Sequence, residues 1–531
     1  MLIVKKTVCF LLLILLSGFL FFSALDKASL WDIDEPNNAE CAREMMIRHD
    51  PIVPTFNGEL RTDKPALIYW CIWSAYKIFG VNEFSARFFS PLFGVATVIL
   101  VFLAGNSLFL WPTGLWAGLI LLSTLFFNIS VRIATPDAAL IFFINLAIFS
   151  FILGYETRRG VYFYLFFLAM ALAVLAKGPM GIVLPLTTIF VFLVIKRDFS
   201  VLKETRLAKG LLLFFLVALP WYVLVGIKTH GAFLVGKEGF LLKHNIHRFL
   251  NPMEGHKAPF FFYIVILPFI FFPWGGLLPH LLWTGHKHRV KRALSNPEMF
   301  LWLWITIFIL FFSLARTKLP TYINPIFPAL AVLTAFYLKE MPVWVTKCFL
   351  HFNGFFALLL LFGGGAALAQ FYPRLGWIAF LGFIPLISWQ IGLYFSRQRQ
   401  HARLVLSQFL GAYLFILALV NWAVPAIDQY KITKSFALQI KQQLKKDAAI
   451  IAYHYFQPSL VFYTQHKVEK INDPGEVAKR MQNTSLTFIV GRKRPLEELR
   501  KDLPKLEIIM CRPGFYIRDK VCLAQACLNI K

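Results

Sequence analysis

The chain has 531 residues, of which 58% are hydrophobic and only 15% are charged, and its formal net charge is +26. A soluble domain carries about 25% charged residues, so this composition excludes an ordinary soluble enzyme and indicates a membrane protein. A basic chain can bind nucleic acid, but membrane topology accounts for much of the positive charge here, and we expect no nucleic-acid partner.

Apolar stretches that reach or approach the roughly 20 residues needed to cross a bilayer run through most of the chain. We count thirteen, near residues 8–25, 86–106, 110–129, 138–154, 161–176, 178–195, 210–227, 259–283, 299–315, 321–338, 348–369, 375–395 and 404–425. The first stretch follows Lys5 and Lys6, as the apolar region of a signal peptide follows its basic region. It is long for a signal peptide, and no small-residue cleavage site comes after it. We therefore interpret it as a retained anchor. Because only Lys177 separates the fifth from the sixth, these two are either separate spans or one bent or re-entrant element.

The basic residues between the spans predict the orientation of the chain. Cytoplasmic loops of membrane proteins are enriched in Lys and Arg. If the N-terminus is cytoplasmic, five successive cytoplasmic loops are basic. One span more or fewer at the start would place these basic loops on the non-cytoplasmic side instead. These loops carry Arg158 with Arg159, residues 196–209, residues 287–292, Lys339 with Lys347, and Arg397 with Arg399 and Arg403. The long loops 26–85 and 228–258 and the tail then fall on the opposite side.

The first long loop reads as short helices. Asp34-Glu35-Pro36 begins one, because proline and acidic residues are favoured in a first helical turn. Asn57-Gly58 marks a turn. The aromatic residues after Pro65 predict a helix that lies on the membrane surface.

The tail has short β-prone runs at residues 449–453, 486–490 and 507–510, with charged helical stretches between them. We therefore divide the chain into a transmembrane domain, 1–425, and a small soluble α/β domain, 426–531. Cys511, Cys522 and Cys527 lie in this tail, and an oxidising compartment would permit one disulfide among them, whose pairing the sequence leaves open.

The interiors of the predicted spans contain no Asp, Glu, Lys or Arg apart from Arg87 at one edge. Charges within spans mark ion and substrate pathways in transporters, so the pattern disfavours a transporter or lipid flippase and favours chemistry at a membrane surface. The loops predicted to be non-cytoplasmic hold the candidates Asp34, Glu35, Asp63, Lys64, Arg132, Asp137, Lys177, His244, His247, Arg248, His256, Arg316 and Lys318.

Two carboxylates are candidates for catalysis. Asp34 follows the first span, where a lipid-linked group can reach, and Asp137 stands at the mouth of a later span. Each could act as a general base or orient an acceptor. Each could equally be a helix cap, which for Asp137 is the stronger interpretation from pattern alone.

Basic residues at span ends suggest a phosphate site. Lys64, Lys177, Arg316 and Lys318, with the hydroxyl of Tyr322, could clamp a phosphate through charge-assisted hydrogen bonds. Lys and Arg at span ends also commonly extend toward lipid headgroups, so this interpretation stays open.

A metal site is a further alternative. His244, His247 and His256 could bind a divalent ion such as zinc, with Asp63 as a carboxylate partner. Histidines in loops are more often plain surface groups.

These motifs, in this order, resemble the bacterial aminoarabinose–lipid A transferase family over essentially the whole membrane region. The shared motifs are Asp34-Glu35 through Ala39-Glu40-x-Ala42-Arg43-Glu44-Met45, Val53-Pro54-x-x-Asn57-Gly58, Asp63-Lys64-Pro65-x-x-x-Tyr69-Trp70, Lys177-Gly178-Pro179, His244-Asn245-x-x-Arg248-Phe249 and Lys318-Leu319-Pro320-x-Tyr322-x-x-Pro325. Each motif is short, but the combination is specific. The tail is similar only in kind, as a soluble periplasmic domain.

The resemblance implies a GT-C fold, related to the protein O-mannosyltransferases, with about thirteen transmembrane helices and a periplasmic C-terminal domain. It implies a polyprenyl-phosphate sugar donor, Asp34 as the leading catalytic carboxylate and Asp137 as a second. By the same resemblance Glu35, Lys64, Lys177, Arg248, Arg316, Lys318 and Tyr322 bind substrate, and Asp63 with His244 can hold a divalent metal.

The chain departs from the family pattern at two places. Pro36-Asn37-Asn38 replaces the usual small residue, arginine and aromatic, and Asp63 replaces the usual glutamate before the lysine. The first departure bears on recognition of the sugar or acceptor, and the second shortens a candidate metal ligand by one methylene.

We therefore expect an inner-membrane glycosyltransferase with its site facing the periplasm. It would transfer a sugar such as 4-amino-4-deoxy-L-arabinose from a polyprenyl-phosphate carrier to lipid A or another periplasmic acceptor. The alternatives are a protein O-glycosyltransferase that uses the same machinery and, from another class, a lipid flippase or transporter.

The basic loops predict a cytoplasmic N-terminus and a C-terminus outside the cytoplasm. A phosphatase fused at residue 430 should therefore be active, because the enzyme matures only after export. A fusion at this residue that is active only in the cytoplasm would contradict the topology. It would also contradict the assignment of the candidate residues to the non-cytoplasmic side.

Overall fold

The structure is a computed structural model that describes residues 2–251, 255, 257–291, 293–444, 447–514 and 519–527. Its contacts divide the chain into two units. The first comprises Met1–Ala24, Thr62–Cys71 and Arg87–Trp422, and the second comprises Leu25–Arg61, Ile72–Ala86 and Ala423–Lys531. The boundary before the tail falls close to the expected one at residue 426. Most of the first long loop, however, belongs with the tail and not, as expected, with the membrane helices.

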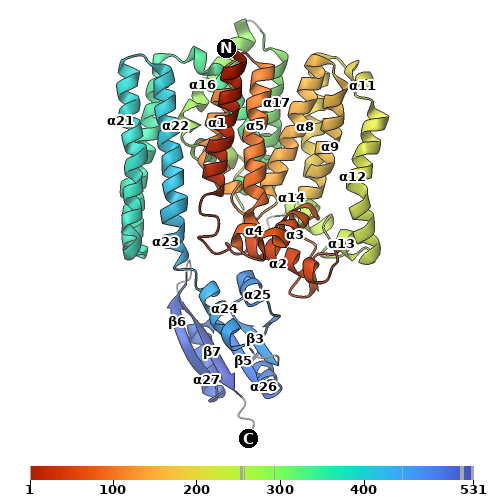
Figure 1. Ribbon diagram of the computed structural model, residues 1–531, viewed down its shortest axis with the longest axis vertical. Coiled ribbons are helices and arrows are strands. Elements are labelled where there is room, and N and C mark those ends of the chain that lie inside the picture. The colour runs from red at the N-terminus through yellow and green to blue at the C-terminus, as the bar shows by residue number, and fades with distance from the viewer. Residues whose placement is uncertain are drawn as a thin grey trace. The chain divides into compact units, whose positions relative to one another are not determined.

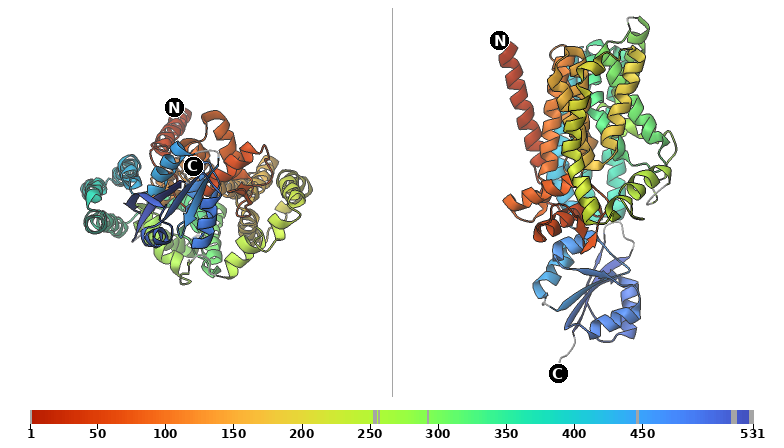
Figure 2. Two further views of the ribbon diagram at one scale, coloured as in Figure 1. Left: turned by 90° about the horizontal axis from the view of Figure 1, so that it is seen from below. Right: turned by 90° about the vertical axis from the view of Figure 1, so that its right-hand side faces the viewer.

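The first unit is a bundle of apolar helices, the longest of which run roughly parallel to one another (Figures 1 and 2). Most are apolar all round, as helices that face lipid or each other must be. The principal helices are α1 (Leu2–Phe22), α5 (Phe89–Leu108), α6 (Thr113–Leu122), α8 (Asp137–Thr157), α9 (Gly160–Lys177), α10 (Met180–Lys196), α12 (Leu207–Lys228), α15 (Phe262–Ile270), α16 (Leu278–Lys291), α17 (Asn296–Leu314), α18 (Phe327–Tyr337), α19 (Val343–Leu358), α20 (Gly364–Phe371), α21 (Phe383–Arg397) and α22 (His401–Ala418).

The number of full-length spans is smaller than the thirteen expected. Among the described residues, ten helices are long and apolar enough to cross a membrane, or eleven if Phe262–Ile270 and Trp274–Lys291, bent by 118°, form one span. The expected spans at 110–129 and 178–195 are the shorter helices α6 and α10. Helix α6 begins only after Pro112, since proline disfavours a helical conformation in the residue before it, and it ends at Leu122.

The sequence left open whether residues 161–195 form one bent element or two helices. The structure has two helices, α9 and α10, that pack against each other. They approach closely at Gly181, where an added Cβ would lie 2.6 Å from the backbone carbonyl carbon of Ala173. A glycine at this point therefore permits the two helices to pack side by side.

Loops that carry basic residues are linked to one another at one end of the bundle. Arg158, after α8, lies 3.3 Å from Asp198 and 3.3 Å from Glu204, both between α10 and α12. Lys287 of α16 pairs with Glu340, just after α18, at 3.1 Å. These pairs agree with the expectation that alternate loops share one side of the membrane.

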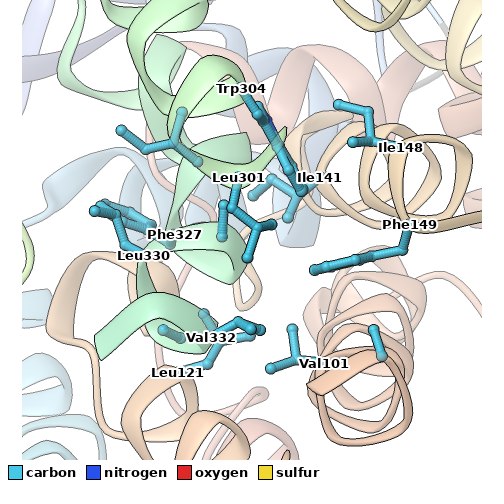
Figure 3. Packing of buried hydrophobic residues seen from close by; sticks show 14 of the residues in the cluster. Val101, Leu121, Ile141, Ile148, Phe149, Leu301, Trp304, Phe327, Leu330 and Val332 are labelled. Carbon is cyan, nitrogen blue, oxygen red and sulfur yellow. The ribbon is translucent and has the colours of Figure 1, made fainter. Parts of the chain in front are cut away.

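Large apolar side chains from α5, α6, α8, α17 and α18 fill the centre of the bundle (Figure 3). Phe149 of α8 and Trp304 of α17 are both fully buried, and their ring centroids lie 5.3 Å apart at 76°. Inside a bilayer, lipid tails are as apolar as these side chains, so close packing holds the helices together more than burial from water does.

The second unit begins with the loop that follows α1. Helix α2 (Asp34–Ile47) starts at the expected residue, and strands β1 (Thr55–Phe56) and β2 (Glu59–Leu60) form a hairpin. Asn57 and Gly58 connect the strands with φ of 57° and 81°, as the two central residues of a type I′ turn require. Helix α3 (Leu67–Phe79) passes from the first unit into the second and is followed by α4 (Glu83–Arg87).

The tail confirms the predicted α/β domain. After α23 (Val424–Asp428) and α24 (Ile432–Gln443), a sheet of five strands has the order β4-β3-β5-β7-β6, with β3, β4 and β5 parallel and β7 antiparallel to its neighbours. Its strands are β3 (Ala448–Tyr453), β4 (Val468–Lys470), β5 (Leu486–Arg492), β6 (Glu507–Pro513) and β7 (Lys520–Cys527). Helices α25 (Pro458–Thr464), α26 (Pro474–Gln482) and α27 (Lys493–Asp502) alternate with the strands.

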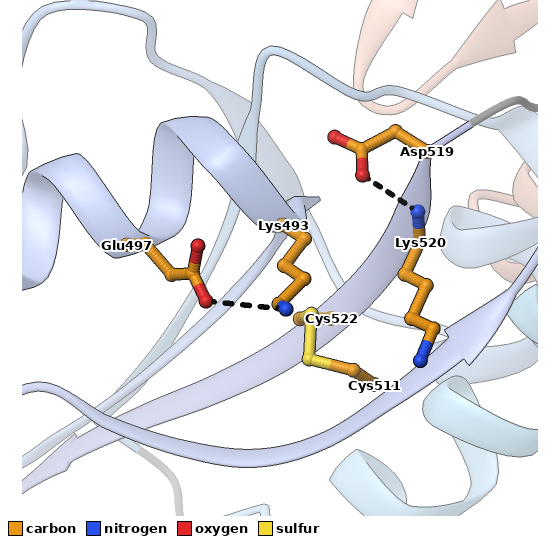
Figure 4. The surroundings of a disulfide bond; sticks show 6 residues. All are labelled: Lys493, Glu497, Cys511, Asp519, Lys520 and Cys522. Atoms are coloured by element: carbon orange, nitrogen blue, oxygen red, sulfur yellow. Dashed lines mark hydrogen bonds and ion pairs between the residues drawn. A yellow bond between two sulfur atoms is a disulfide. The ribbon is translucent and has the colours of Figure 1, made fainter.

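One disulfide links neighbouring strands of this sheet. Cys511 of β6 faces Cys522 of β7 in the strand register, and the two are bonded (Figure 4). This settles the pairing that the sequence left open. The bond closes the connection between the two antiparallel strands at the edge of the sheet.

Candidate active site

Asp137 and Lys177 form an ion pair at one end of the helical bundle. Asp137 is the first residue of α8 and Lys177 the last residue of α9, so the packing of two successive helices brings them together. Their side chains are 13% and 23% exposed. The hydroxyl of Thr135 donates a second bond to the Asp137 carboxylate, at 3.2 Å. The carboxylate is thus paired with a cation and a hydroxyl.

Two further candidates lie close to this pair. The Nζ atom of Lys177 is 5.9 Å from the centre of the Tyr322 ring. Lys64 also interacts electrostatically with Asp137. Two ammonium groups around a single carboxylate leave an excess positive charge, which suits an anion such as a phosphate.

Lys318 lies in the connection between α17 and the 3-10 helix η3 (Pro320–Ile326), which carries Tyr322. Its side chain is only 7% exposed, and its Nζ donates to the carbonyl oxygen of Ala315 at 2.5 Å. Burial lowers the pKa of Lys318. The Tyr263 hydroxyl donates to the carbonyl oxygen of Leu319 at 3.1 Å and holds the same connection in place.

The second long loop contacts this connection directly. The Arg316 amide donates to the carbonyl oxygen of Phe249 at 3.0 Å, and the Thr317 hydroxyl donates to that of Asn251 at 2.9 Å. Two motifs that are far apart in the sequence therefore meet. The Arg316 side chain is exposed, whereas the Arg248 side chain and the whole of His256 fall outside the described residues.

Asp63 and His244 are also brought together, with Oδ1 of the aspartate 2.9 Å from Nε2 of the histidine. The Thr62 hydroxyl donates to the carbonyl oxygen of Glu238 at 2.5 Å, so the two loops touch at a second point. A structural metal site normally has four protein ligands and a catalytic one three. Within the described ranges, no group of three His, Cys, Asp or Glu residues could hold a metal ion. This pair alone does not fit such a site.

Sequence reasoning assigned no role to Arg132, although it is the only charged residue between α6 and Asp137. Its guanidinium donates to the carbonyl oxygens of Leu20, at 2.5 Å, and Phe21, at 2.8 Å, and also to that of Ser23. A cation is favourable at the C-terminal end of a helix. Arg132 therefore fixes the end of α1, where the chain leaves the bundle.

Asp34 and Glu35 belong to the second unit and differ from each other in exposure. Glu35 is 1% exposed, and its carboxylate accepts a bond from the Trp31 amide at 2.8 Å. Asp34 is exposed. Of the two adjacent acids, Asp34 is the one that a substrate can reach, while Glu35 holds the turn before α2.

Comparisons with known proteins show the family to which the chain belongs. The family described as dolichyl-phosphate-mannose-protein mannosyltransferase matches residues 63–223. An uncharacterized protein of Aquifex aeolicus (strain VF5) is 28% identical over 480 residues, which are 89% of this chain and 90% of that protein. The undecaprenyl phosphate-alpha-4-amino-4-deoxy-L-arabinose arabinosyl transferase of Pectobacterium atrosepticum (strain SCRI 1043) is 30% identical over 435 residues, 78% of this chain and 75% of that protein.

The chain belongs to this arabinosyl transferase family. It is a multi-pass membrane glycosyltransferase. A crystal structure of ArnT from Cupriavidus metallidurans bound to undecaprenyl phosphate has the same fold, with a TM-score of 0.82, 21% sequence identity and 97% of both chains covered. The family resemblance and the GT-C fold expected from the sequence are thereby confirmed.

The cations around Asp137 and η3 predict the behaviour of two variants. Lys64→Ala and Lys318→Ala should each weaken use of a lipid-phosphate donor, because each removes a charge-assisted hydrogen bond worth roughly 1.5–3 kcal/mol. That energy corresponds to a loss of about tenfold to a hundredfold in kcat/KM for the donor. The measurement is donor kinetics with the purified full-length protein.

Lys209→Ala is the matched control, since Lys209 is an exposed lysine near the start of α12. It should retain the parent kinetics. If Lys64→Ala and Lys318→Ala behave as Lys209→Ala does, both residues are lipid-headgroup anchors and not donor ligands.

The lowered pKa of Lys318 predicts a pH dependence. A buried lysine loses its proton at a lower pH than an exposed one, and only the charged form binds a phosphate strongly. The donor KM of the parent protein should therefore rise as the pH increases. This rise should begin at a lower pH than the loss of the proton from an exposed lysine would produce. Lys318→Arg stays charged throughout and should remove this rise; an identical rise in the variant would assign it to another group.

Proposed function

We propose that the chain transfers 4-amino-4-deoxy-L-arabinose from undecaprenyl phosphate to lipid A. The observation that carries the proposal is the cluster of Lys64, Lys177 and Tyr322 around Asp137 at one end of the bundle, in a chain of the arabinosyl transferase family. The second transferase reading, protein O-glycosylation, shares this machinery and differs only in the acceptor. The chain belongs to a transferase family, and its spans are poor in charged residues. Both observations disfavour a flippase.

The reaction breaks the bond between the sugar carbon and the lipid phosphate oxygen, and the acceptor oxygen forms the new bond to that carbon. The departing phosphate keeps the bonding electron pair and gains negative charge. Preorganised cations stabilise such charge without rearranging in the transition state. Lys64, Lys177 and Lys318 are the groups that we assign to this task.

Asp34 is the proposed catalytic carboxylate. If the acceptor is a phosphate of lipid A, it is already anionic, and Asp34 orients it or stabilises positive charge on the sugar carbon. If the acceptor is a hydroxyl, Asp34 accepts its proton. The exposure of Asp34 and its place in the family motif support this role.

We further propose that the protein lies in the bacterial inner membrane with this site facing the periplasm. The support is the grouping of basic loops at one end of the bundle, which is typical of a cytoplasmic side. The candidate residues Asp137 and Lys177 lie at the opposite ends of the helices α8 and α9 from Arg158.

Mass spectrometry of lipid A from cells with and without the gene tests the proposed function. Lipid A that carries the aminoarabinose only when the gene is present is the expected result. Unchanged lipid A together with a gene-dependent sugar on a periplasmic protein would support the protein O-glycosyltransferase reading instead.

Asp34→Asn separates a chemical role from a structural one. Asparagine caps a helix about as well as aspartate, so a structural role predicts near-normal activity. A chemical role predicts normal expression with kcat lower by on the order of 100-fold. Asp447→Asn, which changes an exposed carboxylate in the same unit, is the control. Parent-like turnover by a well-folded Asp34→Asn protein would refute the catalytic assignment.

A further inference from the structure

Side chains of the tail bind each of the four residues before Ile33 and Asp34. Ser29 donates from its amide and its hydroxyl to the two carboxylate oxygens of Asp428, at 3.0 and 2.6 Å. Lys431 donates to the carbonyl oxygens of Ser29 and Leu30, both at 2.9 Å, and lies 4.4 Å from the centre of the Trp31 ring. Both partners stand roughly 400 residues later in the sequence.

Tyr463 of α25 forms the next contact along this segment. Its hydroxyl oxygen accepts a bond from the Leu30 amide at 2.9 Å and donates to Glu83 at 2.9 Å. Lys434 of α24 pairs with the same Glu83 carboxylate, and its Nζ lies 5.3 Å from the centre of the Tyr463 ring. The tail thus binds the start of the first loop and the start of α4 through one connected network.

The last of these contacts is two residues from Asp34. Both carboxylate oxygens of Asp32 accept bonds from Ser459, one from its amide at 2.9 Å and one from its hydroxyl at 2.5 Å. Ser459 is 2% exposed. Burial raises the pKa of Asp32, while the two bonds from Ser459 oppose that rise. Asp32 is therefore occupied by a structural contact, whereas Asp34 is exposed.

We propose that Ser459 is a positioning residue for the transferase reaction, and that the C-terminal domain serves to hold the Asp34 carboxylate in place. The inference rests on the proposed function of Asp34. Ser459 fixes Asp32 by two bonds, and only one residue separates Asp32 from Asp34. Loss of the hydroxyl bond leaves Asp32 held by the Ser459 amide alone, which loosens the backbone before α2 and shifts the Asp34 carboxylate from its working position.

The expected kinetic signature is specific. The lysines assigned to the donor phosphate belong to the other unit, so donor binding should not depend on Ser459. A small displacement of a catalytic group lowers turnover steeply, by up to about 100-fold for a shift of 1 Å. Loss of the Ser459 hydroxyl should therefore lower kcat and leave the donor KM nearly unchanged.

The test uses the full-length protein in lipid nanodiscs with the undecaprenyl-phosphate aminoarabinose donor and lipid A. Ser459→Ala should lower kcat by about tenfold, and Ser459→Thr, which keeps the hydroxyl, should restore it. Ser435→Ala is the matched control, because the Ser435 hydroxyl donates to the carbonyl oxygen of Ile432 within α24. Asp32→Ala removes both bonds from Ser459 and should lower kcat at least as much as Ser459→Ala does, and the double variant should lose no more than Asp32→Ala alone.

Amide hydrogen exchange over residues 30–38 supplies a readout that needs no activity. Exchange there should accelerate in Ser459→Ala and stay unchanged in Ser435→Ala. Parent-like kcat or parent-like exchange in Ser459→Ala would overturn the inference. If Asp34→Asn is inactive while Ser459→Ala is fully active, the positioning role of Ser459 is overturned and the catalytic role of Asp34 stands. A parent protein without transferase activity would refute the proposed function, while the exchange data would still decide whether Ser459 fixes the segment.

Discussion

A bilayer offers no water to charged side chains, and this constraint fixes where the protein can carry out chemistry. Charged groups are expensive at the centre of a membrane, and the long helices of the bundle keep them at their ends. Asp137 opens α8 and Lys177 closes α9, so each helix can remain apolar while its terminus carries a charge. The two are largely buried, which is tolerable only because they are paired; removing one partner would strand the other, at a cost of about 3–5 kcal/mol.

The same constraint makes the end of the bundle suitable for a lipid phosphate. Lys318, which is 7% exposed, is held by a carbonyl oxygen in place of water. Lys64 adds a further positive charge near Asp137. Cations that are already desolvated and fixed interact more strongly with an anion than solvated surface lysines do, because the effective dielectric constant is lower. In the proposed reaction a lipid-borne sugar would reach this site from the membrane, with its phosphate at the level of the helix ends.

Much of the fold could be predicted because apolar length and loop charge are read directly from the sequence. The helix at Asp34, the turn at Asn57-Gly58 and three strands of the tail were correctly expected. The number of full-length spans was not, because helix ends depend on local features such as Pro112, after which α6 begins. Strands β4 and β7 were missed; β4 has only three residues and pairs with β3, and β7 pairs with β5 and β6.

The sequence suggested individual candidate residues but not the contacts that they make with one another. Sequence placed Asp137 and Lys177 on one side of the membrane, yet their pairing needs the packing of α8 against α9. The role of Arg132 at the end of α1 was not predicted, since a lone arginine says nothing of which carbonyl groups it will meet. Nor could the sequence show that Asp32, and not Asp34, would be bound by Ser459 from a segment more than 400 residues away.

Transfer of the sugar by the purified protein tests the central claim most directly. The protein, reconstituted in nanodiscs, is given undecaprenyl-phosphate 4-amino-4-deoxy-L-arabinose and lipid A, and both products are quantified by mass spectrometry. The account predicts that free undecaprenyl phosphate and sugar-modified lipid A appear in equal amounts and that both depend on Asp34. Intact donor in the presence of well-folded protein and lipid A, or release of undecaprenyl phosphate without modification of lipid A, would contradict it.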